Sequence, residues 1–196
     1  ATSLASLSLS STGSASSLTV GAIGGGTTAA LTSLTVSAAS SSTTTTGVIT
    51  SSGATAMTSA TLTASDANSV IAIGGALNMG TSAIASFGIT VADNAQLQYN
   101  VSSITSGAIT AGTLSFGDYS TITDIGSNGT EDLTLTGAVT TLGVSLGRGI
   151  TNVALDSIVL SGAVTTLNLS STLGSEAVAM DTSNDLAYGG AELIQF

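Results

Sequence analysis

The sequence predicts an all-β protein whose short strands wind into a β-solenoid, and three observations support this fold class. The stretch 133–146 (LTLTGAVTTLGVSL) recurs at 158–171 (IVLSGAVTTLNLSS), 25 residues further on, with eight identities in fourteen positions. Short runs alternate between aliphatic and Ser or Thr residues, which is the pattern of a half-buried strand. No apolar stripe with a helical period persists for 12 residues. If the copies are neighbouring turns, Val139 stacks on Val164 and Leu142 on Leu167.

The expected strands follow one another along the chain, because each alternating run places aliphatic residues on one face and hydroxyl residues on the other. Thr and Val suit such a pleated surface, since their branched side chains are stiff about χ1. The Ser/Thr run at 40–46 is predicted to be either a loop or an exposed strand. The alternating runs cover residues 7–9, 18–20, 34–36, 89–91, 97–99, 114–116, 133–135, 144–146 and 167–169.

Gly-Ala pairs are expected to form the corners, because small residues let successive turns approach closely. A looser copy of the repeat lies at 104–116, and periods of roughly 20–50 residues are typical of repeat architectures. Asn128-Gly129 is the clearest candidate for a tight hairpin turn. A β-sandwich is the alternative, since it also has short alternating strands. The Gly-Ala pairs begin at Gly21, Gly53, Gly75, Gly107, Gly137, Gly162 and Gly190, at uneven intervals.

Charged side chains are confined to the later part of the chain. The first 65 residues contain none, and all 11 acidic residues follow, against one basic residue, Arg148. This balance excludes the basic patches that bind nucleic acid or anionic membranes. No run approaches the roughly 18 apolar residues of a membrane span, so membrane insertion is not expected. We expect one continuous unit, with residues 1–65 an uncharged candidate assembly surface and residues 66–196 an acidic, repeat-bearing region.

No catalytic or cofactor-binding residue is predicted, and the chain is not expected to be an enzyme. Most catalytic sites need His, Cys or Lys, and all three are missing. The stretch 143–147 (GVSLG) matches the G-x-S-x-G nucleophile elbow of hydrolases. Without His there is no base to activate Ser145, so the match is interpreted as repeat sequence.

Two acidic clusters are candidate Ca²⁺ sites, because carboxylate and amide oxygens suit this cation. Their spacing follows neither the EF-hand nor the Gly-rich repeat of Ca²⁺-binding β-rolls, so solvated turns are the alternative. The clusters are Asp124, Asn128, Glu131 and Asp132, and Asp181, Asn184 and Asp185, with Asp118 beside Tyr119 as a third, weaker candidate. Candidate glycosylation sequons begin at Asn100, Asn128 and Asn168.

The phrase GAVTTLNLS at 162–170, in a chain without Lys or Cys, resembles the repetitive β-solenoid regions of bacterial surface-layer proteins and large secreted adhesins. The stretches 75–84 and 104–116 are also similar to the shafts of phage tail fibres. The resemblance covers most of the chain and is one of composition, so it carries over no functional residue. It implies a structural role on a cell or virion surface.

We expect a non-catalytic extracellular protein that assembles with itself into a filament or surface lattice. Exposed strand edges offer unpaired N–H and C=O groups, and natural monomers block such edges with Lys or Pro, which this chain lacks. One alternative is a binding module, either a phage tail fibre or an adhesin. Another is an ice-binding solenoid, which needs regular rows of Thr. No single coil length relates Thr19, Thr35, Thr63, Thr90 and Thr134.

Overall fold

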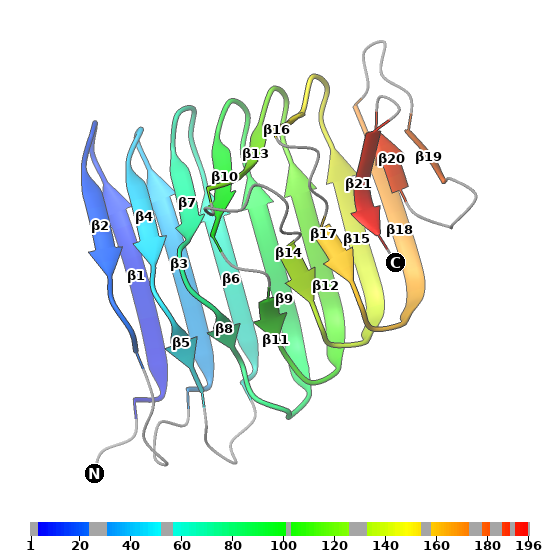
Figure 1. Ribbon diagram of the computed structural model, residues 1–196, viewed down its shortest axis with the longest axis horizontal. Helices are drawn as coiled ribbons and strands as arrows, with labels where there is room; N and C mark the ends of the chain where they lie inside the picture. Colours follow the sequence, from blue (N-terminus) through cyan, green and yellow to red (C-terminus); the bar gives the residue numbers. More distant parts are fainter. Residues whose placement is uncertain are drawn as a thin grey trace.

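The structure is a computed structural model that describes residues 4–23, 31–51, 57–100, 103–125, 133–153, 158–172, 178–180, 186–188 and 191–195. Every regular element in these ranges is a β-strand. The chain winds through about five complete turns, each of which contributes one strand to each of three sheets, here called A, B and C (Figure 1). The predicted β-solenoid is therefore confirmed. The β-sandwich is wrong, because neighbouring strands in sheets A and B are parallel and come from successive turns.

Sheet A contains the longest strands of the molecule. Seven parallel strands lie side by side in it, in the order in which they occur along the chain (Figure 1). Their inward side chains are mostly aliphatic or aromatic, and their outward side chains are mostly Ser and Thr. The strands are β1 (Ser6–Thr12), β3 (Ser33–Ala39), β6 (Ser59–Ala64), β9 (Ile84–Val91), β12 (Ile109–Phe116), β15 (Val139–Leu146) and β18 (Val164–Ser171).

Sheets B and C complete each turn with shorter strands. Sheet B contains β2 (Ser17–Val20), β4 (Thr43–Thr46), β7 (Val70–Ile73), β10 (Gln96–Tyr99), β13 (Thr121–Asp124) and β16 (Thr151–Val153). The parallel strands of sheet C are β5 (Ile49–Thr50), β8 (Leu77–Asn78), β11 (Ser103–Thr105), β14 (Leu133–Leu135) and β17 (Ile158–Leu160). Strand β21 (Ala191–Gln195) pairs in parallel with β17, and β20 (Leu186–Tyr188) and β19 (Val178–Met180) follow it as an antiparallel extension.

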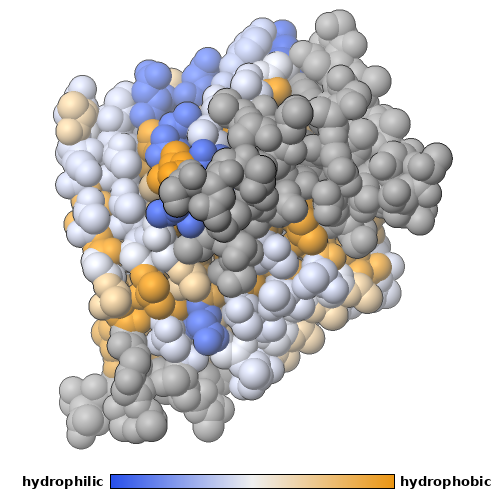
Figure 2. Space-filling model, in the orientation of Figure 1, coloured by the Kyte–Doolittle hydropathy of each residue, from blue (hydrophilic) through white to orange (hydrophobic). Residues whose placement is uncertain are grey.

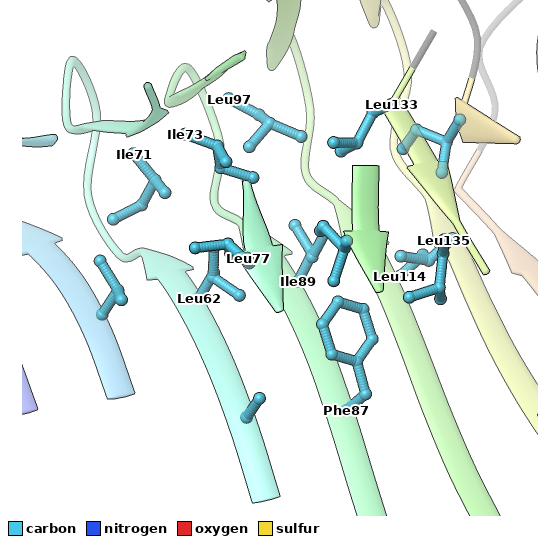
Figure 3. Packing of buried hydrophobic residues seen from close by; sticks show 14 of the residues in the cluster. Leu62, Ile71, Ile73, Leu77, Phe87, Ile89, Leu97, Leu114, Leu133 and Leu135 are labelled. Carbon is cyan, nitrogen blue, oxygen red and sulfur yellow. The ribbon is translucent and has the colours of Figure 1, made fainter. Parts of the chain in front are cut away.

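The three sheets enclose one hydrophobic core. Figure 3 shows Leu62 of β6, Ile71 of β7 and Leu77 of β8 pointing into the same interior, and each is 1% exposed. Large side chains lie beside small ones, because Phe87 pairs in register with Ala60 on one side and with Gly112 on the other. The core is built mainly from aliphatic residues, as the composition indicates.

The two copies of the repeat are neighbouring turns, as predicted. Val139 pairs with Val164 and Leu142 pairs with Leu167 between β15 and β18. Turn length nevertheless varies, since side chains that hydrogen-bond to the next turn find partners 25, 27 or 30 residues away. Register within the sheets is kept while the connections between strands differ in length. Strand β6, which lies before residue 66, pairs with β9, which lies after it, so sheet A spans both regions.

The described Gly-Ala pairs lie at two different corners, where glycines of successive turns stack on one another, and this explains the uneven intervals between the pairs. Gly21, Gly47 and Gly75 lie between sheets B and C, where a Cβ on Gly47 would lie 2.8 Å from the carbonyl carbon of Gly21. A second stack lies between sheets C and A and contains Gly107, Gly137 and Gly162. The prediction of corners is thus confirmed. Gly53 and Gly190 lie outside the described residues.

The corner between sheets A and B uses left-handed backbone, and Gly117 and Gly147 also stack on each other there. Backbone N–H groups there donate to the next turn, for example from Asn94 to the Asp118 carbonyl at 2.8 Å and from Tyr119 to the Arg148 carbonyl at 2.7 Å. Asn tolerates this conformation better than most residues, because its short polar side chain bonds locally. At least one residue with positive φ lies at this corner in each successive turn: Ala15, Ser41, Asn68, Asn94, Tyr119 and Gly149, with Gly13 and Ser40 as second ones in the first two turns.

Residues 43–46 of the Ser/Thr run form the half-buried strand β4, and residues 40–42 lie at the corner before it, so neither an exposed strand nor a loop describes the whole run. Thr44 and Thr46 point into the core and are fully buried. The hydroxyls of Ser11 and Thr44 lie 2.6 Å apart, and Thr44 also donates to the carbonyl oxygen of Ser37 at 2.6 Å. Hydroxyls are tolerated in this part of the core because they bond to one another and to the backbone.

Candidate functional site

The first end of the solenoid exposes apolar side chains that are covered in later turns. Strand β1 is the edge of sheet A at this end, and β2 is the edge of sheet B. Leu7 of β1 and Leu18 of β2 are half-buried, whereas Leu34, which pairs with Leu7 from the next turn, is 1% exposed. Leu4 beside this edge is 47% exposed. The described chain therefore leaves a core cross-section open here.

The opposite end of sheet A is open in the same way. Strand β18 is the edge, and no described residue adds a further strand to it. Leu169 is 44% exposed, although Val144, its partner in β15, is 1% exposed. The antiparallel strands β19 and β20 extend sheet C alone. Apolar surface at an unpaired strand edge is the usual mark of an interaction surface.

The two ends match each other in residue pattern. Counted along the columns of sheet A, Leu7 occupies the same inward position as Leu167, and Leu9 the same position as Leu169. The outward residues between them, Ser8 and Asn168, are uncharged. A β1 edge placed on a β18 edge would thus continue both the inward apolar columns and the outward polar ones.

The outer face of sheet A carries columns of hydroxyl groups across its strands. Pairing aligns Thr63 with Thr90, and Thr35 with Thr61. One column bears a hydroxyl on all seven strands: Ser10, Ser37, Thr63, Thr90, Ser115, Ser145 and Ser170. The adjacent column adds Ser8, Thr35, Thr61 and Thr113. The next column along adds Ser6, Ser33, Ser59, Ser86, Thr141 and Thr166. These side chains together are called the hydroxyl face.

Regular rows are therefore present, although the residue counts between Thr positions are irregular. No single coil length relates Thr19 and Thr134 to the threonines of sheet A, because Thr19 lies on sheet B and Thr134 on sheet C. Rows become regular only when positions are aligned strand by strand.

A hollow of about 280 Å³ lies at the β18 side of the hydroxyl face, where Gly143 interrupts a column.

Charge gathers at the corner between sheets A and B. Asp66, Asp93, Asp118 and Arg148 lie there on successive turns, and Figure 2 shows hydrophilic residues along this edge. The Arg148 backbone N–H donates to Asp118 Oδ1 at 2.9 Å, and Arg148 Nε donates to Oδ2 at 2.8 Å. These bonds, the backbone one foremost, hold the pKa of Asp118 below its ordinary 3.8. Asp93 Oδ1 accepts the N–H of Asp118 at 2.8 Å, so the carboxylates stabilise the corner itself.

We expect Arg148→Gln to raise the pKa of Asp118 only part of the way to 3.8, because the backbone donor remains. An NMR titration of the Asp118 carboxyl carbon measures this shift, and a complete return to 3.8 would contradict the role of the backbone bond.

The same carboxyl makes the stability of the fold depend on pH. A pKa that is lowered in the folded state stabilises the fold above the unfolded pKa, and this stabilisation is lost as the pH falls through the folded pKa. The thermal midpoint should therefore fall more steeply below about pH 4 in the parent than in the variant.

The structure brings together few of the residues proposed as sites from sequence. Asp124 ends β13 beside Tyr99, and no group of three metal-binding side chains occurs among the described residues. Asn100 is exposed after β10, and Asn168 is exposed within β18. Ser145 lies inside β15 and faces outward, so it lacks the strand-to-helix turn of a nucleophile elbow. The remaining candidates, and the turn at Asn128-Gly129, lie outside the described residues: Asn128, Glu131, Asp132, Asp181, Asn184 and Asp185.

Comparison with known proteins adds no family to this description. No protein-family model matches the chain, and neither the curated proteins nor the solved structures give a significant match. No helix of the length and apolarity needed to cross a membrane occurs in the part of the chain that the structure describes.

Proposed function

We propose that the chain is a non-catalytic structural protein that assembles end to end with further copies of itself, outside a cell or on a virion. The observation that supports this most directly is the pair of matching open ends of sheet A. Leu169 is 44% exposed at one end, and its counterparts in inner turns, such as Val144 and Val36, are at most 1% exposed. In the middle of the solenoid, the next turn covers these inner side chains. At the open end, a second copy of the chain would supply the turn that covers Leu169.

The chemistry of the edges favours this contact. Parallel pairing between β1 of one copy and β18 of the next satisfies backbone N–H and C=O groups. The described residues of β1 and β18 carry no charge, so no like-charge repulsion opposes the contact. The resemblance to surface-layer, adhesin and tail-fibre solenoids also supports an extracellular structural role. An adhesin or tail fibre remains the alternative, and an obligate trimer would favour it.

A lysine in the open end should block assembly, and an outward position in the neighbouring strand supplies the control. We expect Leu169→Lys to raise the concentration needed for assembly at least about tenfold, because an unpaired buried charge costs about 3–5 kcal/mol. Ser145→Lys, outward in the adjacent inner strand β15, should assemble like the parent. Sedimentation velocity with negative-stain electron microscopy measures both. A monomeric parent, or equal effects of the two substitutions, would contradict the end-to-end contact.

Mixing two blocked variants tests the polarity of the contact. Leu7→Lys blocks one end and Leu169→Lys blocks the other, so neither variant alone should form the contact. A mixture still offers one intact end of each kind, and we expect it to form dimers and nothing longer. Dimers in either variant alone would instead indicate contact between like ends, and a mixture that stays monomeric would count against the proposal.

A further inference from the structure

We propose that the hydroxyl face of sheet A binds the surface of ice. This proposal is independent of the end-to-end contact, since it concerns the outward side chains of the sheet. The face consists of three parallel columns, and in the first three strands (β1, β3 and β6) every column position is a Ser or Thr. It therefore presents a two-dimensional array of oxygen atoms and not an isolated pocket.

The dimensions of the array follow from β-sheet geometry. Neighbouring strands are about 4.7–4.9 Å apart, and outward residues along one strand repeat at about 6.6–6.8 Å. The strand spacing is close to the repeat of oxygen atoms along one axis of hexagonal ice. Because each turn adds one strand in register, the repeat is kept from β1 to β18 whatever the number of residues in a turn.

The hydroxyls of the central columns are available for a ligand. Thr35, Thr61, Thr63, Thr90 and Thr113 are exposed or half-buried, and none of them makes a side-chain hydrogen bond to another described residue. The inward hydroxyls behave differently, since Ser11, Ser42 and Thr44 are bonded to one another or to the backbone. The threonine hydroxyls of the central columns are thus left to bond with water, whereas Ser33 bonds to Ser6 and Ser170 bonds to the carbonyl oxygen of Val144.

The chemistry of the face favours ice over other ordered surfaces. Among the described strands of sheet A, no outward residue is charged, so neither an ionic mineral nor an anionic polymer is recognised by charge. Crystalline polysaccharides are bound largely by stacking of sugar rings on aromatic side chains. The aromatic residues of sheet A, Phe87 and Phe116, point inward and are buried. An uncharged hydroxyl lattice without aromatics suits ordered water.

The test uses the complete chain and two matched kinds of substitution. Purified parent protein should separate the melting and freezing temperatures of a single ice crystal and shape its growth. Thr63→Lys combined with Thr113→Lys places two long charged side chains on the face, and we expect it to reduce the thermal hysteresis several-fold. Thr19→Lys, on the exposed outer face of sheet B, should leave it unchanged. Circular dichroism confirms that each variant is folded.

Three results would overturn the proposal. The first is a folded parent without thermal hysteresis or ice shaping. The second is hysteresis that survives the double substitution or is lost equally in Thr19→Lys, since ice would then bind elsewhere. The third is a parent that associates laterally and becomes monomeric in the double variant while no form binds ice. The hydroxyl face would then be an interface between copies.

Discussion

Leu142→Asp should lower the free energy of unfolding by about 3–5 kcal/mol, because it removes a buried aliphatic group and leaves a carboxylate without a partner. Leu142 is 1% exposed and lies in register between Gly112 of β12 and Leu167 of β18. No described basic side chain reaches the core, since Arg148 is bonded to Asp118 at the corner. Urea unfolding followed by circular dichroism measures the loss.

Two substitutions in the same sheet serve as controls. Leu167→Asp should cost less, because Leu167 lies in the edge strand β18 and is half-buried. Thr141→Asp changes the preceding, outward position and should shift stability by less than about 1 kcal/mol. If Leu142→Asp unfolds at the parent's urea concentration, the in-register stacking of the two repeats is contradicted.

Gly75→Ala should destabilise the protein by about 1–3 kcal/mol, because the added methyl group meets backbone that has little room to move. A Cβ at Gly75 would lie 2.6 Å from the carbonyl carbon of Gly47 and 3.0 Å from the Cα of Val48. Both atoms belong to the previous turn, so relief requires the two turns to separate locally. Thermal unfolding of the variant measures the effect.

Gly88→Ala is the matched control for the corner glycine. Gly88 faces outward in β9, and a Cβ there meets no atom within 4 Å. Ala also restricts the unfolded chain more than Gly does, so this variant should be as stable as the parent or slightly more stable. If both substitutions destabilise the protein equally, the cause is the lost backbone freedom of glycine. The close approach between turns would then not be the cause.

Period-two alternation predicted six of the seven described strands of sheet A, but only three strands of sheets B and C, β2, β10 and β14. It located the parts of sheet A strands in which every second residue is buried, such as 34–36 in β3 and 114–116 in β12. It missed the first halves of β9, β12 and β15, where two consecutive residues face outward between two buried ones. There Val139 and Leu142 are both inward although three positions apart, which breaks the period.

The candidate surfaces were harder to predict than the strands. The open ends depend on which turns are terminal in the fold, and no single residue type signals that. The hydroxyl columns carry a signal in the sequence, namely Ser or Thr placed between two inward aliphatics, as Thr35 is between Leu34 and Val36. Counting residues between threonines hid it, because the connections differ in length. The burial of Thr44 could not be anticipated, since its partner Ser11 comes from another turn.

The turns differ in length but keep one register, so the length of the solenoid along its axis depends on the number of turns and not on the number of residues in each turn. Each turn advances the axis by about 4.7–4.9 Å, whatever its number of residues. An insertion in a connection between strands should therefore leave the length and the spacing of sheet A unchanged. Deletion of one whole turn should shorten the rod by a single step and leave every face otherwise intact. Length can thus change by adding or removing turns, and the surface pattern can change separately, by replacing outward residues.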